Sequence, residues 1–99
     1  MTYFRFNQIR QWATLRGIYK KGDPKTQALK LQEEVGELCK AILHDDKPEI
    51  KDGIGDCVVV LTSLAKLCGL EIEDCIKSAI EEIENRKGKM YNGTFKKTE

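Results

Sequence analysis

The chain has 99 residues, of which 40% are hydrophobic and 33% are charged, and its formal net charge is +1 at pH 7. This length supports one domain with a small core. The near-neutral charge gives no support to binding of a nucleic-acid polymer, which normally needs a basic excess. The sequence contains no apolar run of about 18 residues and no signal-peptide pattern, so we expect no membrane association and a cytoplasmic location.

Four helices are expected along the chain, followed by a C-terminal arm. Asp23 before Pro24 predicts the start of the second helix, with Asp as the N-cap and Pro in the first turn. Gly88 predicts the end of the fourth helix, and Asn92-Gly93 predicts a turn inside the arm. The expected helices cover about residues 3–16, 24–44, 48–67 and 72–87, and the arm covers residues 89–99.

The third helix contains two glycines, Gly53 and Gly55, and each costs about 1 kcal/mol relative to alanine in a helix interior. Residues 57–61 are rich in β-formers and by themselves are also compatible with a strand. We favour a helix because the segment is long and the sequence offers no second strand to pair with it. The glycines allow another backbone or a ligand to approach closely.

Together these elements predict an all-α fold that resembles a four-helix bundle, in a single domain covering residues 1–99. Such a short bundle is expected to complete its core by oligomerisation, as a homodimer or a homotetramer. The cysteines lie in or beside apolar helical patterns and lack the spacing of a zinc site, so we expect free thiols packed as small apolar side chains. The four are Cys39, Cys57, Cys68 and Cys75.

Acidic side chains flank the apolar stripes of the second and third helices. At about 100° per residue, Glu34 and Glu37 lie about 60° apart, and Glu49, Asp52 and Asp56 lie within about 60° of one another. If the two stripes pack together, carboxylates of both helices meet along one edge, where they need a cation between them. Asp and Glu oxygens favour Mg²⁺ or Mn²⁺. The stripes consist of Leu31, Val35, Leu38 and Ile42 in one helix and of Ile50, Ile54, Val58, Leu61 and Ala65 in the other.

Three segments resemble the MazG-like nucleoside triphosphate pyrophosphohydrolases: KLQEEVGEL at residues 30–38, GDCVVVLTSLAKLCGL at residues 55–70 and NRKGKMYNG at residues 85–93. The pattern of that family is EExxE on one helix and ExxD on the next. The resemblance implies an all-α enzyme that depends on Mg²⁺, with Mn²⁺ as the alternative metal. It also implies hydrolysis of a (deoxy)nucleoside triphosphate to the nucleoside monophosphate and pyrophosphate.

Mapped by motif, the resemblance implies metal binding by Glu34, Glu37 and Asp56. The residue three before Asp56 is Gly53, which has no side-chain ligand. We therefore expect Asp52, one helical turn before Asp56, to serve in its place. An alternative register takes residues 49–52 as the ExxD motif, but it lacks the Gly-Asp-apolar run that follows the family motif.

The implied reaction also needs a base, phosphate-binding cations and contacts to the nucleoside. Glu33 is a candidate to orient or deprotonate the attacking water, and it is equally well explained as a solvated helix residue. Trp12 is a candidate for stacking on the base, although an aromatic residue in an apolar stripe more often belongs to the core. The candidates for binding the phosphates, the ribose or the base are Lys30, Asn85, Arg86, Lys87 and Lys89.

Three other interpretations remain open. A catalytically weak relative that binds nucleotides or a protein partner through the same bundle is favoured by Gly53. A plain helical oligomerisation module would leave the shared acidic edge unexplained. Hydrolysis of phosphoribosyl-ATP shares the fold type and the carboxylate chemistry, but the tail at residues 89–99 and the GIGD run at residues 53–56 fit it less well.

Overall fold

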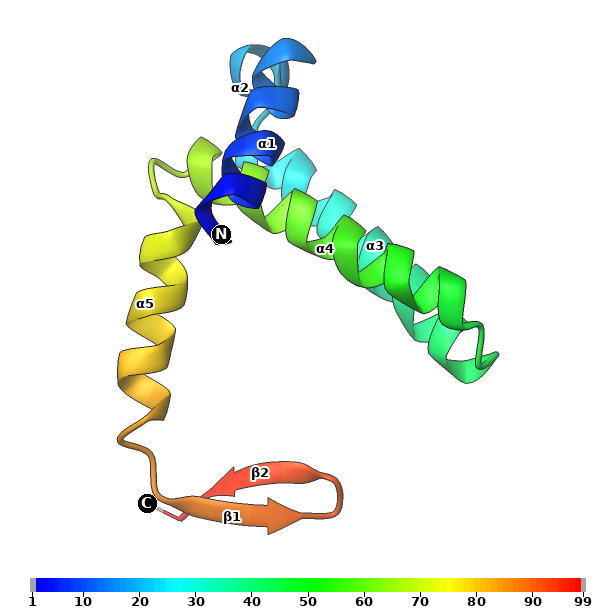
Figure 1. The fold of residues 1–99 in the computed structure, drawn as a ribbon, viewed down its shortest axis with the longest axis vertical. Coiled ribbons are helices and arrows are strands. Elements are labelled where there is room, and N and C mark those ends of the chain that lie inside the picture. The colour runs from blue at the N-terminus through cyan, green and yellow to red at the C-terminus, as the bar shows by residue number, and fades with distance from the viewer. Residues whose placement is uncertain (1, 99) are drawn as a thin grey trace.

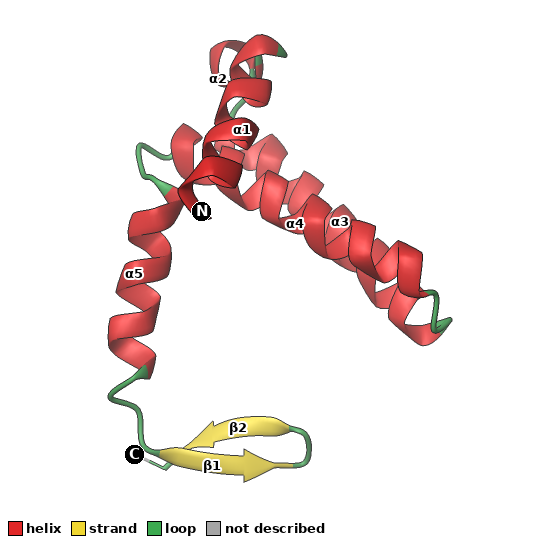
Figure 2. Ribbon diagram, viewed as in Figure 1, coloured by secondary structure: helices red, strands yellow, loops and turns green. Residues whose placement is uncertain are grey.

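The computed structural model describes residues 2–98, with side chains from residue 4 onward. It is mostly helical, which confirms the expected all-α class, and the helices form an open arrangement (Figures 1 and 2). In chain order the elements are α1 (Thr2–Leu15), α2 (Ile18–Lys21), α3 (Pro24–Leu43), α4 (Lys47–Leu67), α5 (Ile72–Ile83), β1 (Gly88–Tyr91) and β2 (Thr94–Lys97).

The two long helices, α3 and α4, form an antiparallel pair, and each begins with an aspartate cap and a proline in the first turn, as expected for α3. Asp23 Oδ1 accepts a hydrogen bond from the Thr26 backbone N–H at 2.9 Å. Asp46 Oδ1 accepts one from the Glu49 N–H at 3.2 Å. Each aspartate thereby satisfies a backbone donor that the first helical turn leaves without a partner. Asp23 thus fixes the start of α3, and Asp46 fixes the end of the short connection from α3 to α4.

Helices α3 and α4 pack against each other through a side that is rotated about each helix axis relative to the expected side. Small residues of α4 face α3, because Gly53 lets the two backbones come close together. The buried or half-buried positions of the seam are Leu31, Glu34, Leu38 and Ala41 on α3 and Gly53, Cys57 and Val60 on α4. The prediction of the apolar stripes was therefore wrong for Val35, Ile42, Ile54, Val58 and Leu61, which are all exposed.

The N-terminal helix α1 packs on the C-terminal half of α4, and this contact contains the best-buried part of the structure. Ala13 of α1 is fully buried, and Thr62 and Ser63 of α4 are 1% exposed. Gly17, with φ +79°, adopts a left-handed conformation that ends α1. The chain then forms the short helix α2, which was not expected. Both elements cover the same end of α4.

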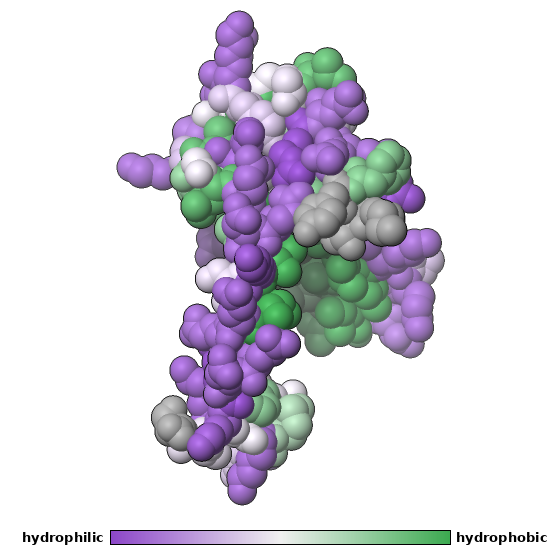
Figure 3. All heavy atoms as spheres, turned by 60° about the vertical axis from the view of Figure 1, so that its left-hand side comes forward, coloured by the Kyte–Doolittle hydropathy of each residue, from purple (hydrophilic) through white to green (hydrophobic). Residues whose placement is uncertain are grey.

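Helix α5 leaves α4 at an angle of 102°. Gly69, at φ +79°, provides the turn between them. The helix ends at Ile83, four residues before the expected end, and its apolar side chains Ile76, Ile80 and Ile83 are exposed rather than facing a core. Figure 3 shows apolar side chains gathered in the recess behind the polar outer surface of this region. The bend removes α5 from the bundle that the sequence predicted.

A paired arginine and glutamate connect α1 to the start of α5. Arg10 donates two hydrogen bonds to Glu73, with Nη1···Oε1 at 2.9 Å and Nη2···Oε2 at 2.5 Å. Both side chains are mostly buried, with 17% and 18% exposed. The guanidinium lowers the pKa of the Glu73 carboxyl below its ordinary value, chiefly through this hydrogen bonding. The pair fixes the direction in which α5 departs.

The C-terminal arm forms a β-hairpin, with its turn at the expected place. Strands β1 and β2 are antiparallel, with Met90 opposite Phe95. Asn92 and Gly93 both have positive φ, at 48° and 83°, which matches the type I′ turn that suits the twist of a hairpin. Gly88 does not end a helix; it lies beneath the ring of Phe95, where a Cβ would approach the ring carbon Cζ to 2.6 Å.

The cysteines are all free thiols, and only part of the expectation for their burial holds. Cys57 is buried and Cys75 is half-buried, but Cys39 and Cys68 are exposed. The open arrangement explains this, because the Cα radius of gyration is 15.7 Å, against about 13 Å for a compact chain of this length. Within residues 2–98 no single helix has both the length and the apolar character of a membrane span; α4 and α5 reach that threshold only as a bent pair.

Candidate functional site

Glu34 lies in the seam between α3 and α4. The sequence predicted that it would flank the apolar stripe, outside the contact between the helices. Its side chain is 13% exposed, whereas that of the neighbouring Glu33 is 65% exposed. Lys30, one turn earlier, lies within 3.6 Å of Glu34 Oε2 and 3.2 Å of Glu33 Oε1. Lys30 is thus the candidate phosphate-binding cation that lies beside the expected carboxylates.

The buried thiol of Cys57 marks where the two halves of the motif meet. Burial is the largest cause of its raised pKa, and the negative charges of Glu34 and Asp56 raise it further. One carboxylate of α3 and one carboxylate of α4 thus contribute to the raised pKa of this thiol. The sequence named both acids as candidates, but it gave no signal that Cys57 is buried at the seam beside them, because an apolar helix pattern explains that cysteine equally well.

Glu37 lines a hollow of about 300 Å³ near the connection between α3 and α4. Lys40 and His44 also line it, although neither was predicted as a site residue. Both lie within two turns of Glu37 on the same side of α3. Asp46 also borders the hollow, with its carboxylate bonded to the helix start. The full lining is Glu37, Lys40, Ala41, His44, Asp46 and Glu49.

The α3–α4 pair has two chemically different sides. In an antiparallel pair, the residues immediately before each seam position project to one side, and those immediately after project to the other. We call the first side the acidic face; it carries Glu33, Glu37, Asp52 and Asp56, with Glu34 at its edge. We call the opposite side the apolar face; it carries Val35, Ile42, Ile54, Val58 and Leu61.

The expected metal ligands share this face without being gathered at one point. Among residues 2–98, no three His, Cys, Asp or Glu side chains stand close enough together to hold a metal ion. Like charges repel one another when no cation lies between them, and exposed glutamates are free to separate. The donors are all hard carboxylate oxygens, so the chemistry of the set fits Mg²⁺ or Mn²⁺.

Gly53 stands where the family pattern has a glutamate, and its surroundings explain why no ligand is there. A Cβ at this position would lie 3.2 Å from Leu38 Cβ, so the residue faces α3 and not the acidic face. Asp52, the expected substitute, is exposed, and it precedes a seam position. The α4 helix can therefore contribute Asp52 and Asp56, but no side chain from position 53.

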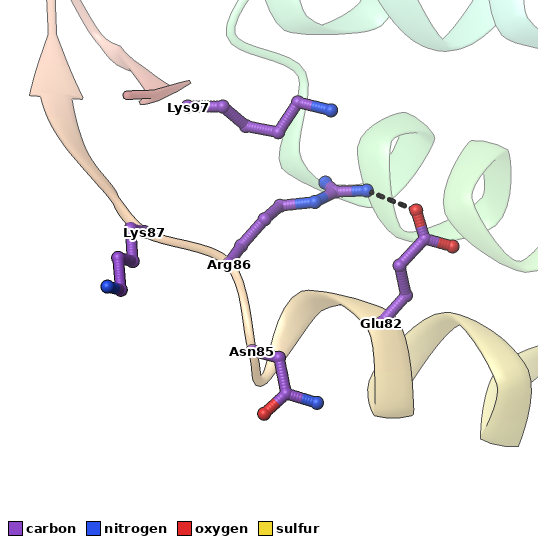
Figure 4. A pocket seen from close by; sticks show the side chains of 5 residues that line it. All are labelled: Glu82, Asn85, Arg86, Lys87 and Lys97. Atoms are coloured by element: carbon purple, nitrogen blue, oxygen red, sulfur yellow. Dashed lines mark hydrogen bonds and ion pairs between the residues drawn. The ribbon is translucent and has the colours of Figure 1, made fainter. Parts of the chain in front are cut away.

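The other candidates for substrate binding lie apart from the acidic face in this chain. Trp12 of α1 is 44% exposed and stacks with the Arg16 guanidinium, 5.9 Å from the ring centre. Lys89 lies on β1 opposite Lys96. A second hollow, of about 270 Å³, lies where α5 meets the hairpin (Figure 4). It is lined by Glu82, Asn85, Arg86, Lys87 and Lys97.

Comparisons with known proteins identify the family of the chain. The family model described as the MazG nucleotide pyrophosphohydrolase domain matches residues 23–91. The chain is 41% identical over 75 residues to an uncharacterized 18.2 kDa protein in the rep-hol intergenic region of Haemophilus phage HP1 (strain HP1c1). That match covers 76% of this chain and 42% of the phage protein, so the chain spans less than half the length of that relative. No solved structure matches the chain.

Proposed function

Because this chain belongs to the MazG nucleotide pyrophosphohydrolase family, we propose that it hydrolyses a (deoxy)nucleoside triphosphate to the nucleoside monophosphate and pyrophosphate. The observation that carries the proposal is the position of Glu34 in the seam between the two motif helices, where its side chain is only 13% exposed. Asp56, from the second half of the sequence motif, directly precedes the buried seam residue Cys57. The placement of both acids at the α3–α4 seam supports a shared carboxylate site, and it agrees with the raised pKa of Cys57, which burial and then the charges of Glu34 and Asp56 cause.

The residues of the acidic face have distinct roles in this proposal. Glu34, Glu37, Asp52 and Asp56 would hold the divalent cation. A Mg²⁺ ion held there would neutralise phosphate oxygens and help to activate a water for attack. Glu33 orients the attacking water and accepts its proton. The water oxygen bonds to the α-phosphorus while the bond from that phosphorus to the pyrophosphate oxygen breaks, and Lys30 lies beside the acids to stabilise the phosphate charge.

We further propose that the active form is a homodimer or a homotetramer located in the cytoplasm, with a nucleoside triphosphate as its substrate. The apolar face exposes five aliphatic side chains on one side of the α3–α4 pair. A contiguous exposed patch of this kind is typical of an interface. The apolar side of α5 is also uncovered. A second copy on these surfaces would supply the core that a single chain lacks.

The test measures pyrophosphate release from a panel of canonical and modified (d)NTPs with Mg²⁺ or Mn²⁺. We expect turnover by the wild type and a loss of at least about 100-fold in Glu37→Ala and Asp56→Asn, because metal-held charge stabilisation contributes several kcal/mol. Glu81→Ala removes an exposed acid of α5 and serves as the matched control, with turnover unchanged. No turnover by the wild type with any nucleotide would contradict the proposal.

One observation favours a second candidate function. Gly53 is packed against Leu38, so the ExxD glutamate has no equivalent here. A protein with this incomplete ligand set could bind nucleotides, or a protein partner, with little turnover. Calorimetry that detects Mg²⁺-dependent nucleotide binding, together with no pyrophosphate release, would establish this binding function in place of the enzyme.

A further inference from the structure

The net charge of +1 is small because two segments of the chain carry opposite charges that cancel. Residues 33–56, which contain the acidic face, carry eight aspartates and glutamates and three lysines. Residues 85–98, which we call the basic arm, carry five lysines and arginines and no acid. Their formal charges are therefore −5 and +5. Surfaces of opposite charge attract and orient each other during association.

The basic arm lacks a supporting surface in its own chain. All residues of β1 and β2 are exposed, and an isolated two-stranded hairpin is marginally stable in water. Because paired residues share a face, Met90, Phe95 and Lys97 lie on one side of the hairpin. Both Met90 and Phe95 are exposed there. A second surface that packs on this face of the hairpin would bury its apolar side chains and neutralise its cation.

The acidic face of the same chain does not provide that surface. Helix α5 departs from α4 at 102°, and the hairpin at its end stands clear of the α3–α4 pair (Figure 1). The Arg10–Glu73 pair further fixes the departure of α5. A second copy of the chain offers an equally charged acidic face, and the uncovered apolar side chains already favour association.

We propose that the basic arm of one copy docks on the acidic face of a second copy and supplies Arg86 and Lys97 to the phosphates of the substrate bound there. This inference rests on the proposed function. Figure 4 shows the Arg86 and Lys97 side chains extending to the same side of the hollow, while Asn85 and Lys87 point away from it. Two cations on one side suit the oxygens of the leaving pyrophosphate.

The contact that Arg86 makes within its own chain does not prevent this role. Its Nη2 lies 3.1 Å from Glu82 Oε1, and the Glu82 side chain is 71% exposed. An exposed pair of this kind, four residues apart on a helix end, contributes little because solvent screens it. The triphosphate as a whole carries several negative charges, whereas Glu82 carries one, so Arg86 exchanges Glu82 for the substrate.

Mixing two inactive variants tests whether the arm acts on a second copy. Glu37→Ala disables the acidic face, and the double variant Arg86→Ala/Lys97→Ala disables the arm. Each alone is expected to lose at least about tenfold in turnover. After subunit exchange in an equimolar mixture, the activity recovers to about one quarter of the wild type for a dimer, because half of the dimers are mixed and each has one complete site. No recovery, or an arm variant as active as the wild type, would overturn the proposal.

A second measurement does not depend on turnover. Amide hydrogen exchange in β1 and β2 is followed over a range of protein concentrations. The wild-type hairpin is expected to gain protection as concentration rises. The face variant Glu33→Gln/Asp52→Asn is expected to lose most of that gain, and Lys77→Ala, which removes a charge outside both segments, keeps it. Protection that is independent of concentration would overturn the docking.

The two measurements separate the two proposals. Concentration-dependent protection in a protein without turnover retains the docking of the arm and rejects the hydrolase function. Turnover by the wild type without complementation between the variants retains the hydrolase and rejects the arm. Protection of the hairpin by a single-stranded oligonucleotide, but not by higher protein concentration, would assign the arm to a nucleic acid and also overturn the inference.

Discussion

Gly53 of α4 lies directly against Leu38 of α3, and a Cβ added to Gly53 would approach the Leu38 Cβ at 3.2 Å and its Cα at 3.3 Å. The glycine at position 53 therefore has two consequences: it lacks the glutamate of the family pattern, and it allows the two helices to pack closely. A side chain at this position would have to enter the seam, because the residue is buried. The metal ligands of α4 are restricted to positions that project toward the acidic face.

The two glycines of α4 are therefore expected to respond oppositely to alanine. Gly55 has no neighbour within 4 Å of an added Cβ, so Gly55→Ala gains about 0.5–1 kcal/mol in the free energy of unfolding from helix propensity. Gly53→Ala gains the same propensity but pushes on the Leu38 backbone, so its net change is smaller or negative. Urea unfolding of the two variants measures the difference; an equal gain in both would contradict the close packing at Gly53.

Restoring the glutamate of the pattern is expected to fail. Gly53→Glu places a charged side chain against Leu38 in the seam, where burial of an unpaired charge is unfavourable. We expect a loss of stability of about 2 kcal/mol or more and no gain in pyrophosphate release. The control is Gly55→Glu, which introduces the same side chain at an open position. A stable Gly53→Glu protein with raised turnover would show that the helices separate readily.

Thiol labelling tests the placement of Glu34 without any substrate. The pKa of Cys57 is raised by burial and then by Glu34 and Asp56, and the thiolate is the reactive form. Cys57 should react more slowly than the exposed Cys39 at pH 8. Glu34→Gln removes one charge, lowers the pKa of Cys57 and should increase its labelling rate about two- to tenfold. Glu33→Gln, at a more exposed position, should change it less; mass spectrometry after timed alkylation distinguishes the sites.

The Arg10–Glu73 pair predicts how stability depends on pH. The pKa of Glu73 is lower in the folded chain than its ordinary value of 4.5. Its contribution is therefore present above pH 4.5 and is lost as pH falls through the lowered value. Glu73→Gln should lower the free energy of unfolding by about 1–2 kcal/mol at pH 7, and the difference from the wild type should shrink toward pH 3.

The matched control for this pH series is Glu82→Gln, which breaks the exposed pair with Arg86. Its effect at pH 7 should be below about 0.5 kcal/mol. Chemical unfolding at several pH values provides the comparison. A Glu73→Gln deficit that stays constant down to pH 3 would show that the charge of Glu73 is not what stabilises the contact.

The apolar face predicts the effect of a charge on association. Val58 is exposed at the middle of that face, so Val58→Glu should shift the oligomer toward the monomer and remove the dependence of the melting temperature on protein concentration. Ser78→Glu adds the same charge on the polar side of α5 and should leave association unchanged. Sedimentation at several concentrations measures both. A Val58→Glu protein that associates like the wild type would exclude this face as the interface.

Local signals in the sequence predicted the elements well. Asp23 with Pro24 predicted the start of α3, because capping depends on neighbouring residues alone. Asn92 and Gly93 fixed the turn of the arm for the same reason. The strands around that turn were missed, since a hairpin of residues such as Lys89 and Lys96 has no strong apolar alternation.

The sequence by itself determined the family and the helical class, because these follow from motif spacing and local propensity, and the same motif predicts which acids form the site. Only the tertiary structure decided which side of each helix is covered. The close contact at Gly53 turns Glu34 into the seam and leaves Val58 outside. The bend after α4 likewise separates the basic arm from the acidic face. Helical periodicity is compatible with burial of any of several neighbouring sides of a helix. Which side is buried depends on how closely the two backbones can approach each other.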